Sequence, residues 1–411
     1  MAPSAPAAEY EKEIRALYRE RNERTFGQPH KSHGGVGRRL VDFTALLVLI
    51  GTVSVAASIS VYNWLVPTGL FITAEQRLYP TMAQPELADD FVKQLAGSAA
   101  TVFAARSVKA NASLSEQSYL ANEALGQALV LSSDGWLVTT QAVVAEASDD
   151  YVVVPADGRV YQVTAVALDP AAPLAYLKIA NRNLTAIPFA AVNELTVNAP
   201  VVAIVGESQS TARSWYLRYL ANMGARTPLV GRAELPVASE SLPDRFLLDQ
   251  ALPAGSKGAP IVSLQGKVVG LAADYGGVVR GVVPLANLSP VMETLFAEQA
   301  ARRPLIGLTY VQSTWLLTPS SPGSAGAVLT SAARRAAVVS NSPAAKAGLK
   351  EGDSIVAIDN EPLNYLSLSF MLQRYRPGAT VELTVERAGK EQKVKVTLGE
   401  VEGESNQIKT E

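Results

Sequence analysis

The segment from Phe43 to Trp64 is mostly hydrophobic and contains no Asp, Glu, Lys or Arg. A helix of this length spans roughly 33 Å, about the thickness of the hydrocarbon core of a bilayer. Lys and Arg are frequent before the segment and rare just after it, so the positive-inside rule places the N-terminus in the cytoplasm. The pattern predicts a cytoplasmic charged tail over residues 1–42 and a transmembrane helix over residues 43–66. A buried core helix and a cleaved signal peptide are the alternatives.

Alternating hydrophobic and polar residues fill the next part of the chain, after a proline-containing connector over residues 67–86. Short β-rich runs such as YVVVPADGRVYQVTAVALD are separated by turn dipeptides, of which Asp134-Gly135 is one. Such dipeptides between alternating runs are typical of hairpins. Residues 87–301 are therefore predicted to form an all-β barrel or sandwich that ends in a helix.

Strands and helices are mixed in the last part of the chain. The pattern over residues 302–400 predicts two strands, a short helix, a strand, a second helix and two further strands. This order predicts a separate α+β domain. Residues 401–411 are polar and are predicted to form a tail. The fold class that we expect is mainly β, with one N-terminal transmembrane helix.

Composition excludes several classes of function. The 36 Lys and Arg are balanced by 38 Asp and Glu, so the chain lacks the basic surface that nucleic-acid binding requires. Cys is absent, which excludes disulfides, thiol nucleophiles and cysteine-based metal sites. The two histidines, His30 and His33, stand in a Gly-rich segment without the further ligands that zinc needs. We therefore expect no nucleic-acid partner, no metal and no cofactor.

The run from Val338 to Leu363, VVSNSPAAKAGLKEGDSIVAIDNEPL, resembles the PDZ domains of bacterial proteins. Such domains bind the C-terminus of a peptide by strand addition, and backbone N–H groups bind its carboxylate. The resemblance implies that the carboxylate loop and the helix beside the groove are formed by Leu305, Ile306, Gly307, Leu308, Ser367 and Met371. The alternative is a PDZ fold whose groove is filled internally or packed against its neighbour.

Three segments of residues 87–301 carry a second resemblance. They are GWLVTTQAVV from Gly135, APLAYLKI from Ala172 and LDQALPAGSKGAP from Leu248. With the PDZ-like run and the predicted anchor, they resemble the HtrA/Deg family of membrane-anchored trypsin-like serine proteases, which implies a chymotrypsin-like double β-barrel. The catalytic His, Asp and Ser positions of that family are matched here by Ala142, Pro173 and Lys257.

None of these three side chains can perform the role that the triad mechanism requires. An alanine accepts no proton, a proline orients no imidazole, and a lysine has no hydroxyl. We therefore expect no catalytic residue and no enzyme activity. The resemblance makes Gly255, Ser256 and Lys257 the remnant of an oxyanion loop. Two other chemistries stay open, a dyad of Ser256 with Lys257 and a pocket for an anion beside the lysine ammonium.

The resemblance then implies a pseudoprotease anchored in the inner (cytoplasmic) membrane, with both folded domains in the periplasm. Its PDZ domain is expected to bind peptide or protein C-termini, as a scaffold, sensor or regulator in envelope protein quality control. The first alternative is an active serine endopeptidase that degrades misfolded envelope proteins. The second is an inactive subunit that regulates an active HtrA-type protease, within a homotrimer or a hetero-oligomer.

Overall fold

The structure is a computed structural model, and the chain divides into two compact units, residues 1–84 and residues 85–411. It describes residues 36–65, 93, 95–106, 113, 118–144, 150–206, 213–226, 235–242, 244–315, 326–363, 366–403 and 405–407. The predicted connector over residues 67–86 lies outside the described residues, as do His30 and His33 in the charged tail.

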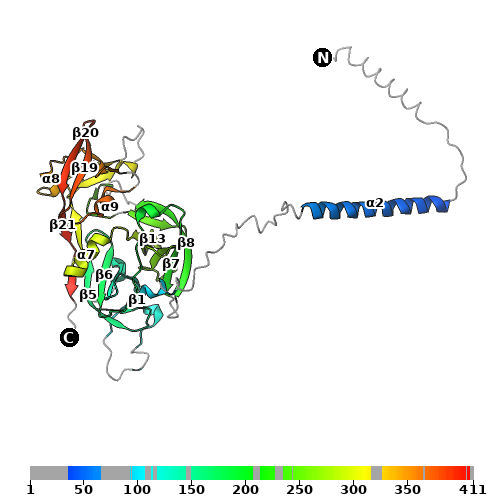
Figure 1. Ribbon diagram of the computed structural model, residues 1–411, viewed down its shortest axis with the longest axis horizontal. Helices are drawn as coiled ribbons and strands as arrows, with labels where there is room; N and C mark the ends of the chain where they lie inside the picture. Colours follow the sequence, from blue (N-terminus) through cyan, green and yellow to red (C-terminus); the bar gives the residue numbers. More distant parts are fainter. Residues whose placement is uncertain are drawn as a thin grey trace, which may run out of the picture. The chain divides into compact units, whose positions relative to one another are not determined.

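The first unit contains helix α2 (Val36–Leu65), drawn in blue in Figure 1, which runs through the segment predicted to cross the membrane. The large apolar side chains described within residues 46–55 of this helix, Leu47 and Ile50 among them, are exposed. Within the ranges that the structure describes, no helix is both long and apolar enough to cross a bilayer. The transmembrane helix over residues 43–66 therefore stays a prediction.

The second unit begins with a closed six-stranded barrel. Its strands follow the order β5-β4-β1-β2-β3-β6, and β5 also pairs with β6, which closes the sheet. Every residue of β2 and β3 is buried, whereas buried and partly exposed side chains alternate along β5. The strands are β1 (Ala99–Ala104), β2 (Gly126–Val130), β3 (Trp136–Thr140), β4 (Tyr151–Val154), β5 (Tyr161–Leu168) and β6 (Leu174–Ile179).

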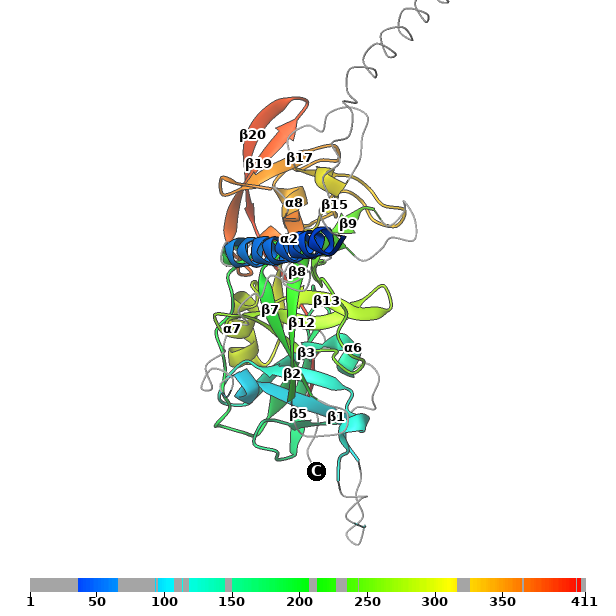
Figure 2. The same ribbon diagram turned by 90° about the vertical axis from the view of Figure 1, so that its right-hand side faces the viewer.

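A second closed barrel follows, with the strand order β10-β13-β12-β11-β7-β8. Helix α7 (Ser289–Glu298) comes after its last strand, within the predicted closing helix. The two barrels confirm the predicted trypsin-like, mainly β architecture, and Figure 2 shows the first barrel below the second. The strands are β7 (Pro200–Gly206), β8 (Arg213–Arg226), β10 (Asp244–Leu248), β11 (Pro260–Ser263), β12 (Val268–Tyr275) and β13 (Val278–Pro284).

The last part of the chain forms the predicted PDZ domain, with a sheet in the order β20-β19-β17-β16-β15-β9. Strand β9 (Val237–Ala238) precedes β10 in the sequence, yet it pairs with β15 at the edge of this sheet. The elements are β15 (Thr309–Gln312), β16 (Ala327–Leu329), α8 (Pro343–Lys346), β17 (Ser354–Ile358), β18 (Glu361–Pro362), α9 (Leu368–Leu372), β19 (Thr380–Arg387) and β20 (Lys390–Thr397). The described residues also include the short 3-10 helices η1 (Ala121–Glu123), η2 (Val192–Glu194) and η4 (Ser313–Trp315).

The C-terminal segment differs from the predicted polar tail, because residues 399–407 contribute two strands. Strand β21 (Gly399–Glu402) pairs with β14 (Arg302–Leu305), and Arg302 lies near the carboxylates of Glu400 and Glu402. Strand β22 (Ser405–Gln407) then pairs with β5 of the first barrel. Part of the predicted tail therefore pairs as strands at sheet edges, a role that composition alone does not distinguish from a tail.

A buried polar cluster lies between the first barrel and the segment that leads into the PDZ domain. The guanidinium of Arg303 donates to the carboxylate of Asp169 from Nε, at 3.2 Å to each oxygen, and from Nη2 at 2.7 Å, and its Nη1 donates at 2.7 Å to the carbonyl of Asn287. The hydroxyl of Tyr176 donates to the same carboxylate at 2.6 Å. The side chain of Asn287 in turn donates to the carbonyl of Phe370 in α9. These contacts join three segments that are distant in the sequence.

The cluster predicts how stability depends on pH. Burial alone would raise the pKa of Asp169, but the Arg303 guanidinium and the hydrogen bond from Tyr176 hold that pKa below its ordinary value. Since the folded pKa is depressed, this stabilisation is present above about pH 4, the ordinary pKa of aspartate, and is lost as the pH falls through the folded pKa. We expect urea unfolding of Asp169→Asn to depend less on pH below pH 4 than that of the unmodified chain. Parallel pH profiles would contradict this role of the carboxylate.

Candidate active site and peptide groove

The first two sequence-predicted triad positions lie next to each other in the first barrel. Helix α6 (Gln141–Val144) follows β3 directly, and Ala142 is exposed on it. The backbone N–H of Gln141 donates a 3.0 Å hydrogen bond to the carbonyl of Pro173, which precedes β6. Pairing of β3 with β6 therefore sets both positions at the same end of the sheet.

The third position reaches the same place from the second barrel. The carbonyl of Lys257 accepts a 2.8 Å hydrogen bond from the N–H of Gln127 in β2. A Cβ atom at Gly126 would lie 2.7 Å from that carbonyl oxygen and 2.5 Å from Cγ2 of Val143 in α6. Only glycine therefore fits between the helix and the loop. The structure thus brings together the three positions that the sequence motifs mark.

The side chains around Lys257 form separate contacts. The Lys257 Nζ atom lies 3.4 Å from a carboxylate oxygen of Asp274, and about a quarter of the lysine side chain is exposed. The Ser256 hydroxyl is buried and donates a 2.7 Å hydrogen bond to the carbonyl of Pro253. The hydroxyl is therefore directed at a carbonyl, and the ammonium at a carboxylate. Gly255, the third residue of the expected oxyanion loop, has a φ of +84° that suits glycine.

Histidine is absent from residues 34–411 of the sequence. The imidazole of a Ser-His-Asp mechanism is thus not supplied by the barrels or by the PDZ domain. Any hydrolysis at this site would have to use a different proton acceptor.

The predicted PDZ groove lies between β15 and α9, and it is occupied. Strand β9 pairs antiparallel with β15, with Ala238 opposite Thr309. The N–H of the next residue, Ser239, donates a 2.9 Å hydrogen bond to the carbonyl of Leu308. The following carboxylate, of Glu240, accepts a 2.7 Å hydrogen bond from the N–H of Gly307. The alternative of an internally filled groove therefore describes the structure.

The predicted groove residues take different places. Leu305 is the last residue of β14, and Ile306, Gly307 and Leu308 form the loop between β14 and β15, where Gly307 has a φ of +80°. The hydroxyl of Ser367 caps the first turn of α9 and also donates to the carboxylate of Asp244. Met371 is buried in the core of the domain.

Four residues at the groove were not predicted from the sequence: Ser239, Glu240, Tyr310 and Ser369. Burial, together with the charge of Asp244, raises the pKa of Tyr310 to about 12, so its hydroxyl stays protonated. That hydroxyl accepts a 3.1 Å hydrogen bond from the N–H of Ser369. The PDZ pattern could have indicated Tyr310, which follows the carboxylate loop. Nothing in the sequence marks Ser239 or Glu240 as neighbours of that loop.

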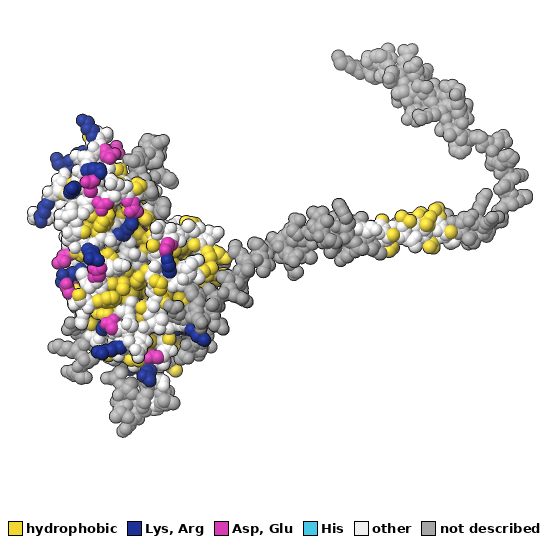
Figure 3. All heavy atoms as spheres, in the orientation of Figure 1, with side chains coloured by type: hydrophobic (Ala, Val, Ile, Leu, Met, Phe, Trp, Pro, Cys, Tyr) yellow, Lys and Arg dark blue, Asp and Glu magenta, His cyan; other side chains and the backbone are white. Residues whose placement is uncertain are grey.

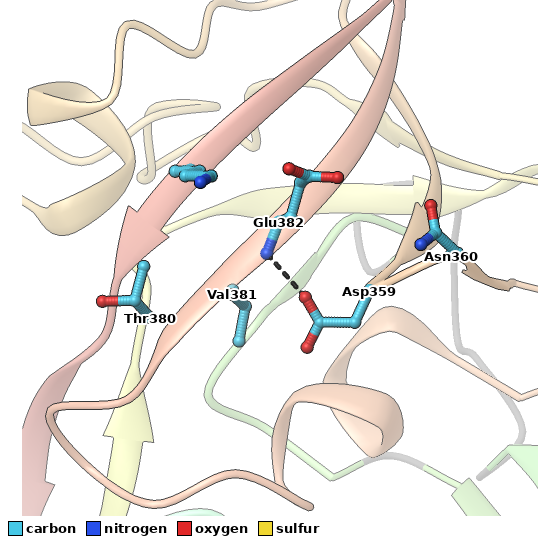
Figure 4. A pocket seen from close by; sticks show the side chains of 6 residues that line it. Asp359, Asn360, Thr380, Val381 and Glu382 are labelled. Atoms are coloured by element: carbon cyan, nitrogen blue, oxygen red, sulfur yellow. Dashed lines mark hydrogen bonds between the residues drawn. The ribbon is translucent and has the colours of Figure 1, made fainter.

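A separate pocket of the PDZ domain lies where the turn after β17 meets β19 and β20 (Figure 4). The N–H of Glu382 donates a 2.8 Å hydrogen bond to Asp359 there. The ammonium of Lys393 lies 2.6 Å from the carboxylate of Glu382 and 2.9 Å from the side-chain oxygen of Asn360. Figure 3 shows acidic and basic side chains interspersed on the face in view. These groups neutralise one another locally and indicate no catalytic centre.

Comparisons with known proteins agree with the two parts of this architecture. Residues 126–271 match the trypsin-like peptidase domain, and residues 305–398 match the PDZ domain. A relative from Bartonella henselae, described as a probable periplasmic serine endoprotease DegP-like, is 29% identical over 311 residues. That match covers 73% of this chain and 58% of the relative. A relative of the same description from Ectopseudomonas mendocina is 27% identical and is covered to 58%.

Solved structures show the same fold. The HtrA-type protease AlgW with a tripeptide matches with a TM-score of 0.53 and 23% identity, over 76% of this chain and 96% of that one. The structure of AlgW with a decapeptide matches with a TM-score of 0.51 and 21% identity, over 76% and 98%. The chain spans just under three fifths of the length of the curated relatives from Bartonella and Ectopseudomonas.

The relatives correct one expectation. The prediction that the chain is not an enzyme is contradicted, because the matching proteins are described as serine endoproteases and HtrA-type proteases. The prediction rested on the residue types at Ala142, Pro173 and Lys257. The assignment of these positions to a catalytic triad itself stays a prediction.

Proposed function

We infer that this chain belongs to the HtrA-like family, in which a trypsin-like peptidase domain is joined to a C-terminal PDZ domain. On this basis we propose that it recognises extended polypeptides outside the cytoplasm. The observation that carries the proposal is the groove between β15 and α9, which already holds an extended strand, β9. Strand addition of this kind is how PDZ domains bind peptides. Peptide or protein C-termini are the proposed ligands.

Serine endopeptidase activity in the periplasm is the reaction that the relatives' descriptions support. We propose Ala142, Pro173 and Lys257 as the positions at which to look for its chemistry, since the structure gathers them at one place. The loop of Gly255 and Ser256 would lie against the bound polypeptide. Cleavage here would depend on groups other than an imidazole, because the barrels contain no histidine.

Anchoring and assembly belong to the same proposal. The uncharged segment from Phe43 to Trp64 supports a membrane anchor with the folded domains on the periplasmic side. Fractionation of cells that express the full chain, with and without residues 43–66, would test the anchor.

A second candidate is a regulatory subunit, within a homotrimer or in a hetero-oligomer with an active protease. Mass measurement of the purified protein would test that role.

Peptide binding gives the direct test of the groove. A fluorescein-labelled ten-residue peptide with a free C-terminal carboxylate is expected to bind the full chain at least about tenfold more tightly than the same peptide with a C-terminal amide. The reason is that a charge-assisted hydrogen bond to a backbone N–H contributes about 1.5–3 kcal/mol. Fluorescence anisotropy measures both affinities. Equal affinities across a panel of peptide sequences would contradict recognition of C-termini.

Cleavage is tested with the same preparation. The full chain is incubated with a reduced, unfolded protein, and the fragments are identified by mass spectrometry. Fragments that disappear with Lys257→Ala would support endopeptidase chemistry at the gathered positions. Fragments that persist in that variant would place the chemistry elsewhere. A substrate that stays intact would contradict the endopeptidase function and leave peptide recognition.

A further inference from the structure

The direction of strand β9 is that of a bound peptide. PDZ ligands run antiparallel to the strand beside the groove, with the C-terminus at the carboxylate loop. The chain from Val237 to Glu240 runs this way, since Val237 lies opposite Tyr310 and Ser239 reaches Leu308. Residues 237–240 of the chain therefore lie in the groove in the orientation of a C-terminal peptide.

The carboxylate of Glu240 occupies the place of a ligand's C-terminal carboxylate. It accepts the Gly307 N–H at 2.7 Å, and the Ser239 hydroxyl donates to it at the same distance. The N–H of Leu308 donates to the Ser239 hydroxyl at 2.9 Å. Glu240 is 9% exposed, so this carboxylate is largely removed from water. Two successive N–H groups of the loop are thus engaged by the chain itself.

The opposite wall of the groove also holds the segment. The hydroxyl of Ser369 in α9 donates to the carbonyl of Ala238 at 3.3 Å, and Ser367 is hydrogen-bonded to Asp244 just beyond the segment. Ala238 and Ser239 are 6% and 1% exposed. The segment is therefore bound on both sides of the groove, and a second strand cannot add at the same edge of β15.

We infer that residues 237–240 are an internal ligand, and that a peptide C-terminus enters the groove only by displacing them. This inference rests on the proposed peptide recognition and adds its regulation. The internal segment also indicates the ligand class: a peptide that ends in small side chains, as in Val237-Ala238-Ser239, followed by a carboxylate. The measured affinity is the intrinsic affinity multiplied by the fraction of molecules in which the groove is open.

The test compares affinities for one probe, a fluorescein-labelled peptide with the sequence of residues 235–239 and a free C-terminal carboxylate. Removing the internal carboxylate with Glu240→Ala is expected to tighten binding about tenfold, because the competing segment loses a charge-assisted hydrogen bond. Glu240→Gln, which keeps an acceptor but not the charge, is expected to give a smaller gain. Glu391→Gln on exposed β20 is the matched control and is expected to bind as the unmodified chain does.

A second readout follows the segment itself. Hydrogen exchange at the Ser239 amide is expected to accelerate when the probe saturates the unmodified chain, because its hydrogen bond to Leu308 is then broken. Unchanged exchange with bound probe would contradict displacement.

The outcomes separate this inference from the proposed function. Binding of equal affinity by the unmodified chain and Glu240→Ala overturns the internal ligand and leaves peptide recognition intact. Binding by neither chain, for this probe and for the peptide panel above, overturns both. Thermal unfolding of each variant shows whether a loss of binding reflects a loss of fold.

Discussion

Arg303→Met is expected to lower the free energy of unfolding by about 3–5 kcal/mol, because removing one partner of a buried ion pair leaves the other charge uncompensated. Both side chains of the pair are almost wholly buried, at 2% and 0% exposure for Arg303 and Asp169. The methionine fills most of the volume of the lost side chain, so the missing charge and hydrogen bonds dominate the effect. The Asn287 carbonyl also loses a donor.

Urea unfolding of the purified protein measures this loss, and the adjacent arginine supplies the control. Arg302 lies on the surface near the carboxylates of Glu298, Glu400 and Glu402, with 27% of its side chain exposed. Exposed ion pairs contribute about 0–1 kcal/mol each, so Arg302→Met is expected to cost much less than Arg303→Met. If Arg302→Met and Arg303→Met lowered the free energy of unfolding by similar amounts, burial would not determine how much the Arg303–Asp169 ion pair contributes to stability.

Gly258→Ala is expected to cost at least about 3 kcal/mol of stability. A Cβ atom there would lie 2.1 Å from the carbonyl oxygen of Gln127 and 2.5 Å from the hydroxyl of Thr139. The residue also has a φ of +75°, a conformation that costs an L-residue about 1–2 kcal/mol. Backbone on one side and a buried hydroxyl on the other leave little room for relief, and such overpacking adds about 1–3 kcal/mol.

Gly255→Ala separates strain from crowding within the same loop. Gly255 has a φ of +84°, but no atom lies within 4 Å of a Cβ built there. Its substitution is expected to cost only the conformational strain, about 1–2 kcal/mol. Thermal or urea unfolding of both variants gives the comparison. Equal losses would mean that the loop can move away from β2 without penalty, and that the close approach at Gly258 is not required.

The hydrophobic pattern predicted an all-β region followed by an α+β domain, and the family resemblance predicted the double barrel, the PDZ domain and the positions of the candidate active site. The turn at Gly135, with a φ of +109°, is one signal of the all-β region, because an Asp-Gly dipeptide between alternating runs favours a hairpin. Ala142 and Pro173 could be placed because the segments GWLVTTQAVV and APLAYLKI match family motifs. Lys257 could be placed because its glycine-rich segment matches a family motif without a gap.

Features that depend on pairing between distant residues could not be predicted in this way. Strand β9 has two residues, too few for an alternating pattern, and it pairs with a strand about 70 residues later. Arg303 and Asp169 are 134 residues apart, and each reads in isolation as an ordinary surface charge. The polar composition of residues 401–411 likewise hid β22, which is stabilised by backbone pairing with β5 rather than by apolar side chains.

The pairing of β22 with β5 has a consequence for the order of folding. Residues 405–407 lie beside residues 165–167, along the part of the β5 edge that β4, which pairs only with Tyr161 and Gln162, does not reach. A chain that emerges from its N-terminus first must therefore complete the second barrel and the PDZ domain before this strand edge is covered. Unpaired edges promote aggregation, and contacts between residues more than 200 positions apart form slowly. The first barrel is synthesised first, but its β5 edge is the last to be paired. We therefore expect this barrel to need protection by chaperones for the longest time.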